Sequence, residues 1–106
     1  MVPTNHHFNN REHLLNQVHQ IAKHHLSGLK VRLYLFGSWA RGEERSSSDI
    51  DLAVDYDQTL PSGTIAMLRE AYEESNIPFT IDLVDLTQTD PEFKEKVEKE
   101  GVRWSV

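Results

Sequence analysis

Residues 31–56 read VRLYLFGSWARGEERSSSDIDLAVDY, and they predict two strands joined by a polar loop. Val31 to Phe36 is short, rich in β-branched and aromatic residues, and runs into Gly37, so it predicts a strand that ends at this glycine. Ile50 to Tyr56 predicts a second strand. The intervening residues Glu43 to Ser48 are polar and without periodicity, which is typical of a solvated loop. Because this link is too short for a full helical crossover, we expect the two strands to be antiparallel.

The residues on either side of this pair predict three helices and a third strand. Apolar residues recur at helical spacing from Asn10 to Leu26, after an N-cap at Asn9 or Asn10, and again around Leu60 to Ser75. Phe79 to Leu86 predicts a strand, which can be parallel to its neighbour because a helix precedes it. Asp90-Pro91 is an N-cap and first-turn proline pair, and Gly101 stands where a C′ glycine belongs. The predicted class is therefore α/β or α+β, with a small mixed sheet flanked by helices.

Length, charge and composition limit the classes of protein that the chain can represent. A chain of 106 residues fits one domain, 1–106, of which we expect residues 1–9 to be flexible. The formal net charge of −6 opposes direct binding of nucleic acid. The absence of cysteine excludes disulfides and thiolate metal sites. No apolar run approaches the roughly 20 residues of a membrane span, so we expect a cytoplasmic protein that does not bind membranes.

Two carboxylates alternate along the second predicted strand. Since side chains alternate across a strand, Asp49 and Asp51 project from one face, about 6–7 Å apart. Ile50, Leu52 and Val54 take the opposite face and can pack into the core. A divalent cation would neutralise the acids, and Mg²⁺ prefers hard oxygen ligands of this kind. The alternative is a solvent-facing strand edge, on which the acids need no ligand.

Gly37-Ser38, at the end of the preceding strand, favours the functional interpretation of these acids. A glycine lets the backbone approach a phosphate closely, and a hydroxyl beside free N–H groups can hold it. A phosphate cradle beside a pair of metal-binding carboxylates indicates nucleoside triphosphate chemistry.

The segments GSWARG at 37–42 and SDIDL at 48–52 resemble the signature of the DNA polymerase β nucleotidyltransferase superfamily. The family pattern is G-S, ten residues, then D-x-D, and ten residues separate Ser38 from Asp49. The resemblance covers most of the chain and implies a DNA polymerase β-like nucleotidyltransferase fold. It also implies a reaction in which an acceptor hydroxyl attacks the α-phosphate of a nucleotide and pyrophosphate leaves.

A third carboxylate of the superfamily lies on a later strand, and residues 78–86 are similar to that strand. Alternation places Asp82 on the face of Asp49 and Asp51, whereas Asp85 falls on the face of Phe79. We therefore choose Asp82 as the third acid and expect Asp85 to be a strand-end or capping residue. Whether Asp82 holds a metal ion or accepts the proton of the nucleophile stays open, since both roles need a carboxylate in the same place.

The resemblance implies roles for the remaining residues of the two segments. Asp49, Asp51 and Asp82 are expected to bind two Mg²⁺ ions, and Gly37 and Ser38 to position the triphosphate of ATP. Arg41 is expected either to reach a phosphate or to pair with Asp49 or another acid. Gly42 is expected to end a helix.

In size and motifs the chain resembles the minimal nucleotidyltransferases, a family paired with helical HEPN-family proteins. Some members are antitoxins that adenylylate a tyrosine of a HEPN ribonuclease and silence it. The resemblance therefore implies ATP as donor, a tyrosine of a HEPN-family toxin as acceptor, and a hetero-oligomer with that partner. Two alternatives stay open: a non-catalytic antitoxin that neutralises its HEPN partner by contact, and nucleotidyl transfer to a small molecule.

Overall fold

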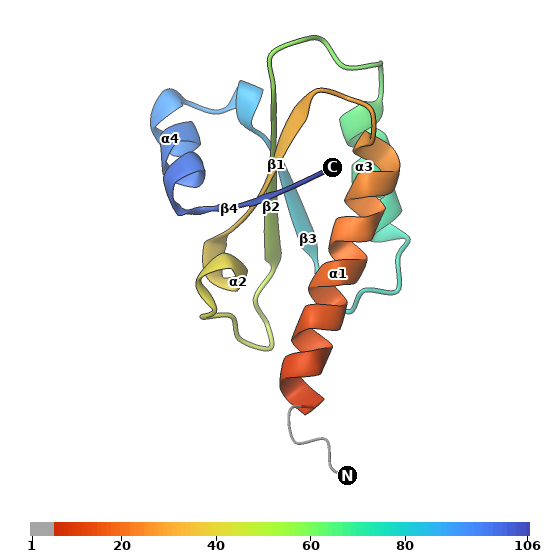
Figure 1. Cartoon of the computed structure of the whole chain (residues 1–106), viewed down its shortest axis with the longest axis vertical. Helices are drawn as coiled ribbons and strands as arrows, with labels where there is room; N and C mark the ends of the chain where they lie inside the picture. The colour runs from red at the N-terminus through yellow and green to blue at the C-terminus, as the bar shows by residue number, and fades with distance from the viewer. Residues whose placement is uncertain (1–5) are drawn as a thin grey trace.

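A computed structural model describes residues 6–106 of the chain, with side chains from residue 10 onward. Of residues 1–9, which we expected to be flexible, 1–5 lie outside the described residues, whereas 6–9 belong to α1, so the N-cap predicted at Asn9 or Asn10 is wrong. The elements, shown in Figure 1, are α1 (His6–Leu26), β1 (Val31–Phe36), α2 (Gly37–Arg41), β2 (Ile50–Tyr56), α3 (Thr64–Glu73), β3 (Ile81–Asp85), the 3₁₀ helix η1 (Leu86–Gln88), α4 (Pro91–Glu100) and β4 (Val102–Trp104).

The four strands form one mixed sheet in the order β3-β2-β1-β4. β1 pairs antiparallel with β2 and with β4, and β2 pairs parallel with β3. The predicted mixed sheet, the antiparallel first pair and the parallel third strand are therefore confirmed. The bounds of β1 and β2 also agree with those expected from the sequence.

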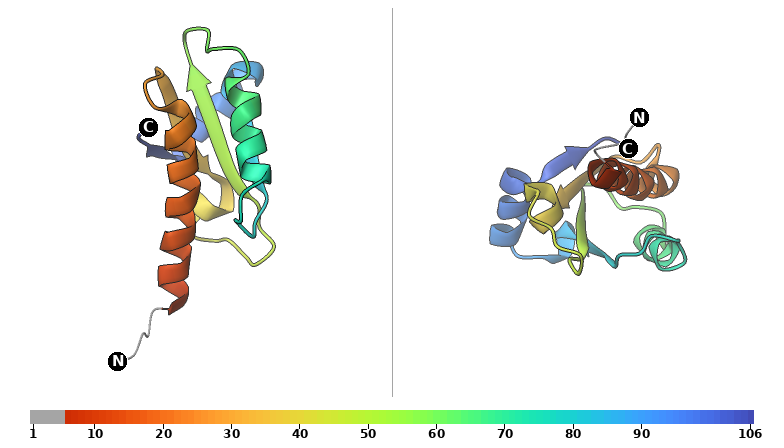
Figure 2. Two further views of the ribbon diagram at one scale, coloured as in Figure 1. Left: turned by 90° about the vertical axis from the view of Figure 1, so that its right-hand side faces the viewer. Right: turned by 90° about the horizontal axis from the view of Figure 1, so that it is seen from below.

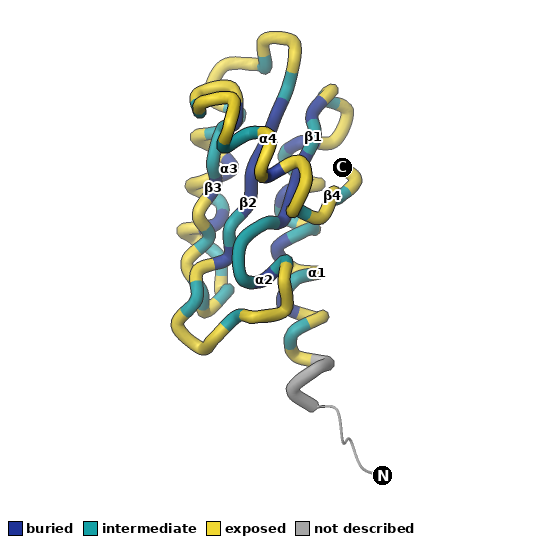
Figure 3. The backbone as a smooth tube through the Cα atoms, turned by 90° about the vertical axis from the view of Figure 1, so that its left-hand side faces the viewer, coloured by how far each residue is buried: buried dark blue, intermediate teal, exposed yellow. Residues whose placement is uncertain are grey.

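Helices cover both faces of the sheet. Figure 2 shows α1 and α3 on one side and α4 on the other. Leu33, Ile50, Leu52 and Val54 are fully buried and belong to the cluster under α1 and α3, together with Val18 and Leu68 of those helices. Tyr34, Ala53, Leu86 and Val97 form the smaller cluster under α4. Burial is concentrated in β1 and β2 (Figure 3), and each large apolar side chain buried there contributes about 1.5–3 kcal/mol.

Three elements of the structure are absent from the predicted order, and two others are shorter than expected. α2, η1 and β4 were missed because five, three and three residues are too few to show a period, although Gly42 was expected to end a helix. α3 begins at Thr64 rather than near Leu60, because Gly63 turns the chain with a φ of 83°. β3 ends at Asp85 because the side chain of this residue caps η1 by accepting a hydrogen bond from the Thr87 amide.

Gly101 is required for a reason other than the one predicted. Its φ of −80° is extended rather than left-handed, so the predicted C′ conformation is wrong. A Cβ atom at this position would lie 2.7 Å from the carbonyl oxygen of Val97 and 3.1 Å from that of Leu35. The glycine therefore lets the end of α4 approach β1 closely enough for β4 to pair with that strand.

Candidate functional site

Three carboxylates lie near one another at the end of the sheet where β1 ends and β2 begins. Asp51 is the direct partner of Asp82 in the parallel pairing of β2 with β3. Since paired residues of neighbouring strands face the same side, about 4.8 Å apart, both side chains lie on the face covered by α4. Asp49 immediately precedes β2 and is exposed. The structure thus brings together the three acids chosen from the sequence, while Ile50 and Leu52 lie in the core on the opposite face.

The pKa of the Asp51 carboxyl reports the electrostatics of this cluster. Burial raises the pKa, and the negative charges of Asp82 and Asp49 raise it further, while the guanidinium of Arg41 opposes them. The negative charge of the three carboxylates therefore exceeds the positive charge that Arg41 supplies. A set of carboxylate oxygens of this kind suits a divalent cation. Within residues 10–106, no three His, Asp or Glu side chains are arranged as a ready-made metal site.

Gly37 joins β1 to α2 and contacts Asp51. Its φ is 73°, in the left-handed region that favours glycine. A Cβ atom on Gly37 would collide with Oδ2 of Asp51 and lie 3.1 Å from its Cγ. The phosphate-cradle glycine is therefore also what leaves room for the central acid. Ser38 follows it in the first turn of α2, where no side chain caps the helix.

Arg41 pairs with an acid, which is one of the two roles left open by the sequence, and this pair leaves its role toward a phosphate open. That acid is Glu43 rather than Asp49: Nε donates a hydrogen bond of 2.9 Å to Oε1 of Glu43. This bond and the nearby carboxylates raise the pKa of Arg41. Both side chains are exposed, at 48% and 66%, and exposed pairs of this kind contribute little to stability. Gly42 ends α2 with a φ of 71°, as predicted.

Asp85 lies at the end of β3 and has a structural role. Its side chain accepts hydrogen bonds from the Thr87 amide at 2.9 Å and from the Tyr56 hydroxyl at 2.8 Å. The predicted capping role of Asp85 is confirmed. Asp85 pairs with Val54, whereas Asp82 pairs with Asp51, so geometry separates the two acids.

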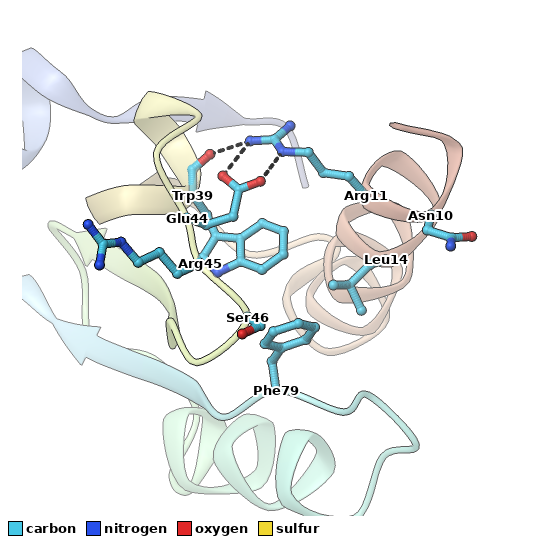
Figure 4. A pocket seen from close by; sticks show the side chains of 8 residues that line it. All are labelled: Asn10, Arg11, Leu14, Trp39, Glu44, Arg45, Ser46 and Phe79. Atoms are coloured by element: carbon cyan, nitrogen blue, oxygen red, sulfur yellow. Dashed lines mark hydrogen bonds and ion pairs between the residues drawn. The ribbon is translucent and has the colours of Figure 1, made fainter. Parts of the chain in front are cut away.

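Trp39 is a positioning residue that the sequence analysis did not single out. It forms a wall of a cavity of about 300 Å³ between α1 and the loop that precedes Asp49, together with Leu14 and Phe79 (Figure 4). Its Nε1 donates a hydrogen bond of 3.3 Å to the carbonyl oxygen of Ser48. The only sequence signal for this role is an apolar aromatic residue directly after Gly37-Ser38. The indole thus supports the backbone of the residue before Asp49.

Arg11 fastens the same loop to α1. Its guanidinium donates to Oε2 of Glu44 at 2.6 Å and to the carbonyl oxygen of Trp39 at 2.6 Å (Figure 4). The loop that delivers Asp49 is therefore held at two points, although it has no regular structure of its own.

The sequence profile described as polymerase beta, nucleotidyltransferase matches residues 16–103. The chain belongs to this family. The match spans all three acids, Gly37 and Arg41, so the resemblance and the expected fold are confirmed, and the enzyme class is that of a nucleotidyltransferase.

Relatives of this nucleotidyltransferase-family chain carry more specific names. It is 34% identical over 67 residues to a probable protein adenylyltransferase MntA of Haemophilus influenzae, covering 63% of this chain and 59% of that protein's length. It is 32% identical over 75 residues to the protein adenylyltransferase MntA of Thermococcus cleftensis, covering 66% of this chain and 75% of the relative. A crystal structure described as a toxin-antitoxin with AMP-PNP superposes with a TM-score of 0.66 at 28% identity, covering 86% of this chain and 73% of that one.

Among the described residues, no helix combines the length and the apolar character that crossing a membrane requires.

Proposed function

We propose that this protein is a Mg²⁺-dependent adenylyltransferase that moves AMP from ATP to a tyrosine hydroxyl of a HEPN-family partner toxin. The observation that carries the proposal is the meeting of Asp49, Asp51 and Asp82 beside Gly37, whose missing side chain makes room for Asp51. The names of the MntA relatives support AMP transfer to protein. The related toxin-antitoxin structure with AMP-PNP, an ATP analogue, supports ATP as the donor.

The acid cluster has the chemistry of a site for Mg²⁺. Asp49 and Asp51 would hold two ions, with Asp82 completing the set. Burial, and then the charges of Asp82 and Asp49, raise the pKa of Asp51, and a cation would neutralise these charges. When bound, Mg²⁺ supplies Lewis-acid stabilisation of the negative charge that develops on the transferred phosphate.

The residues of the chain itself position the two reactants. Gly37 and Ser38 seat the triphosphate at the start of α2, next to Asp51. A bond forms between the tyrosine oxygen and the α-phosphorus, while the bond from that phosphorus to the bridging oxygen breaks and pyrophosphate leaves with the electron pair. Asp82 lies on the far side of Asp51 from Gly37, where it can face the acceptor, and there it orients the hydroxyl or takes its proton.

The acceptor belongs to a partner chain in this account. The antitoxin then acts as a hetero-oligomer with its toxin, and the modified tyrosine silences the toxin. We place this reaction in the cytoplasm, in keeping with a chain that lacks cysteine.

Transfer from differently labelled nucleotides tests the proposal. With the HEPN-family partner and Mg²⁺, label at the α-phosphate of ATP should pass to the partner, and label at the γ-phosphate should not. Asp51→Asn should abolish the transfer, while Glu98→Gln, a charge change at an exposed position of α4, should not. Neutralisation of the toxin by Asp51→Asn without any label would instead indicate an antitoxin that acts by contact. Labelling of a small molecule but not of the partner would contradict the protein acceptor.

A further inference from the structure

A second, smaller cavity of about 160 Å³ adjoins the acid cluster. It lies between α2, which contributes its first residue Gly37 and its last residue Arg41, and α4, which contributes Phe93, Lys96 and Glu100. Phe36 of β1 and Phe93 form its apolar base, with ring centroids 5.8 Å apart in an edge-to-face arrangement.

This cavity shares a wall with the proposed site of transfer. Gly37 lines the cavity on one side and contacts Asp51 on the other. Phe36 is also the direct strand partner of Asp51, so both occupy the same face of the sheet. A group held in the cavity is therefore adjacent to a phosphate seated at Gly37 and Ser38, on the side away from Asp82.

The charges that line the cavity suit an anion. Arg41 and Lys96 are both exposed cations from different helices. Arg41 is engaged only in an exposed pair with Glu43, and pairs of that kind are weak. Lys96 forms no ion pair with any residue of the described part of the chain. Glu100 is the one carboxylate in the lining, and its charge acts on Arg41.

The backbone around α4 keeps Lys96 in this place. Nζ of Lys94 lies 3.2 Å from Oδ2 of the buried Asp55, which fastens the helix to β2. At the other end, Gly101 allows the close approach to Leu35. Lys94 thus holds α4 against the sheet, whereas Lys96 is available to bind a ligand.

We infer that Lys96 of α4 binds the terminal phosphates of the nucleoside triphosphate in this cavity, beside Arg41 of α2. The inference rests on the proposed function and adds to it a residue, Lys96, that binds the leaving pyrophosphate. Glu100 is the anion that the terminal phosphates displace from the neighbourhood of these cations. An AMP molecule lacks the terminal phosphates and does not reach the cavity.

Binding of ATP, ADP and AMP to the full chain, measured by calorimetry in the presence of Mg²⁺, tests this inference. Lys96→Gln should weaken ATP binding about tenfold and leave AMP binding unchanged. Glu100→Gln should tighten ATP binding, again with no effect on AMP. Lys99→Gln is the matched control, because Lys99 is an exposed lysine of the same helix outside the cavity lining. Lys96→Arg should restore most of the affinity for ATP.

Three results would overturn the inference. Lys96 does not contact the terminal phosphates if Lys96→Gln binds ATP as tightly as Lys99→Gln does. The same conclusion follows if Lys96→Gln loses equal affinity for ATP and for AMP. If Glu100→Gln leaves ATP binding unchanged, Glu100 is not a displaced anion. If the unsubstituted chain binds AMP but not ATP, the proposed function fails as well, which distinguishes that failure from the failure of the role of Lys96 alone.

Discussion

Gly37 and Asp51 are packed so closely that no side chain can be placed on the glycine without displacing the carboxylate. The two residues come from different elements, the β1–α2 junction and the interior of β2. Gly37 and Asp51 therefore form one structural unit, and a substitution of either residue should change the position of the other.

Replacement of Gly37 by alanine should damage both stability and nucleotide binding. The left-handed backbone costs an alanine about 1–2 kcal/mol, and the collision with Asp51 adds to this cost. Gly28→Ala is the control, because Gly28 has a similar φ of 84° but open space around its Cα. Chemical denaturation and ATP calorimetry should show loss of stability in both variants and loss of ATP binding only in Gly37→Ala. Equal ATP binding by the two variants would contradict the coupling of Gly37 to Asp51.

Substitution of the two acids of β3 should separate catalysis from folding. Asp82→Asn should retain ATP binding but reduce AMP transfer by two or more orders of magnitude, because a positioned carboxylate contributes roughly 10²–10⁴-fold. Asp85→Asn should lower the free energy of unfolding by about 1 kcal/mol, because it weakens the bonds to Thr87 and Tyr56, and should leave transfer intact. Single-turnover transfer assays and urea denaturation measure the two effects. The opposite pattern would make Asp85 the third acid.

Acid should destabilise the fold in part through Asp55. Burial opposes the charged form of this carboxylate, but hydrogen bonds from Arg32 and Lys94 outweigh it and hold the pKa below the ordinary value. A lowered pKa in the folded state stabilises the protein above the ordinary aspartate pKa of about 3.9, and this contribution is lost as the pH falls below it. Asp55→Asn should therefore be less stable at pH 7 by roughly 1.5–3 kcal/mol.

The comparison of Asp55→Asn with the unsubstituted chain across pH checks this assignment. The difference in unfolding free energy should be constant from pH 7 to pH 5 and shrink below about pH 4. Asp57→Asn, at the exposed end of the same Arg32 network, should show a much smaller effect at every pH. A difference that grows as the pH falls would show that Asp55 is not held in its charged form.

Trp39 should affect transfer through the loop that carries Asp49. Trp39→Phe keeps an aromatic wall of the cavity but loses the bond from Nε1 to Ser48, at a cost of about 1 kcal/mol. We expect a reduced maximal rate of transfer at saturating ATP, with a smaller change in stability than the 3–5 kcal/mol of Trp39→Ala. A Trp39→Phe variant with unchanged rate would mean that this bond does not position Asp49.

The sequence carried most of the information about β1, β2 and the acids on them. Gly37 marks the end of β1, and the alternation of Ile50, Leu52 and Val54 with acids sets both the bounds of β2 and its buried face. On the strand that the resemblance to the nucleotidyltransferase superfamily singled out, the same alternation gave the face of Asp82, whereas its register beside Asp51 is a finding of the structure. Local pattern was sufficient in these cases because side-chain direction in a strand depends only on the backbone period.

Features that depend on contacts between distant residues could not be predicted in this way. β4 consists of three residues, and only its pairing with Leu33 and Leu35 makes it a strand. The conformation of Gly101 is set by its approach to the Leu35 carbonyl rather than by the helix it follows. The choice of Glu43 by Arg41, and the cavity that Arg41 shares with Lys96, likewise depend on how α2 and α4 lie across the sheet.

We propose that the acid cluster of Asp49, Asp51 and Asp82 transfers AMP to a tyrosine of a HEPN-family partner. The most direct measurement is mass spectrometry of that partner after incubation with this protein, ATP and Mg²⁺, with peptide mapping to locate the modified residue. AMP should be found on a tyrosine of the partner, should be absent when the protein carries Asp49→Asn, and should be present when it carries Glu98→Gln. An unmodified partner that is nevertheless bound and neutralised, with or without Asp49, would contradict it.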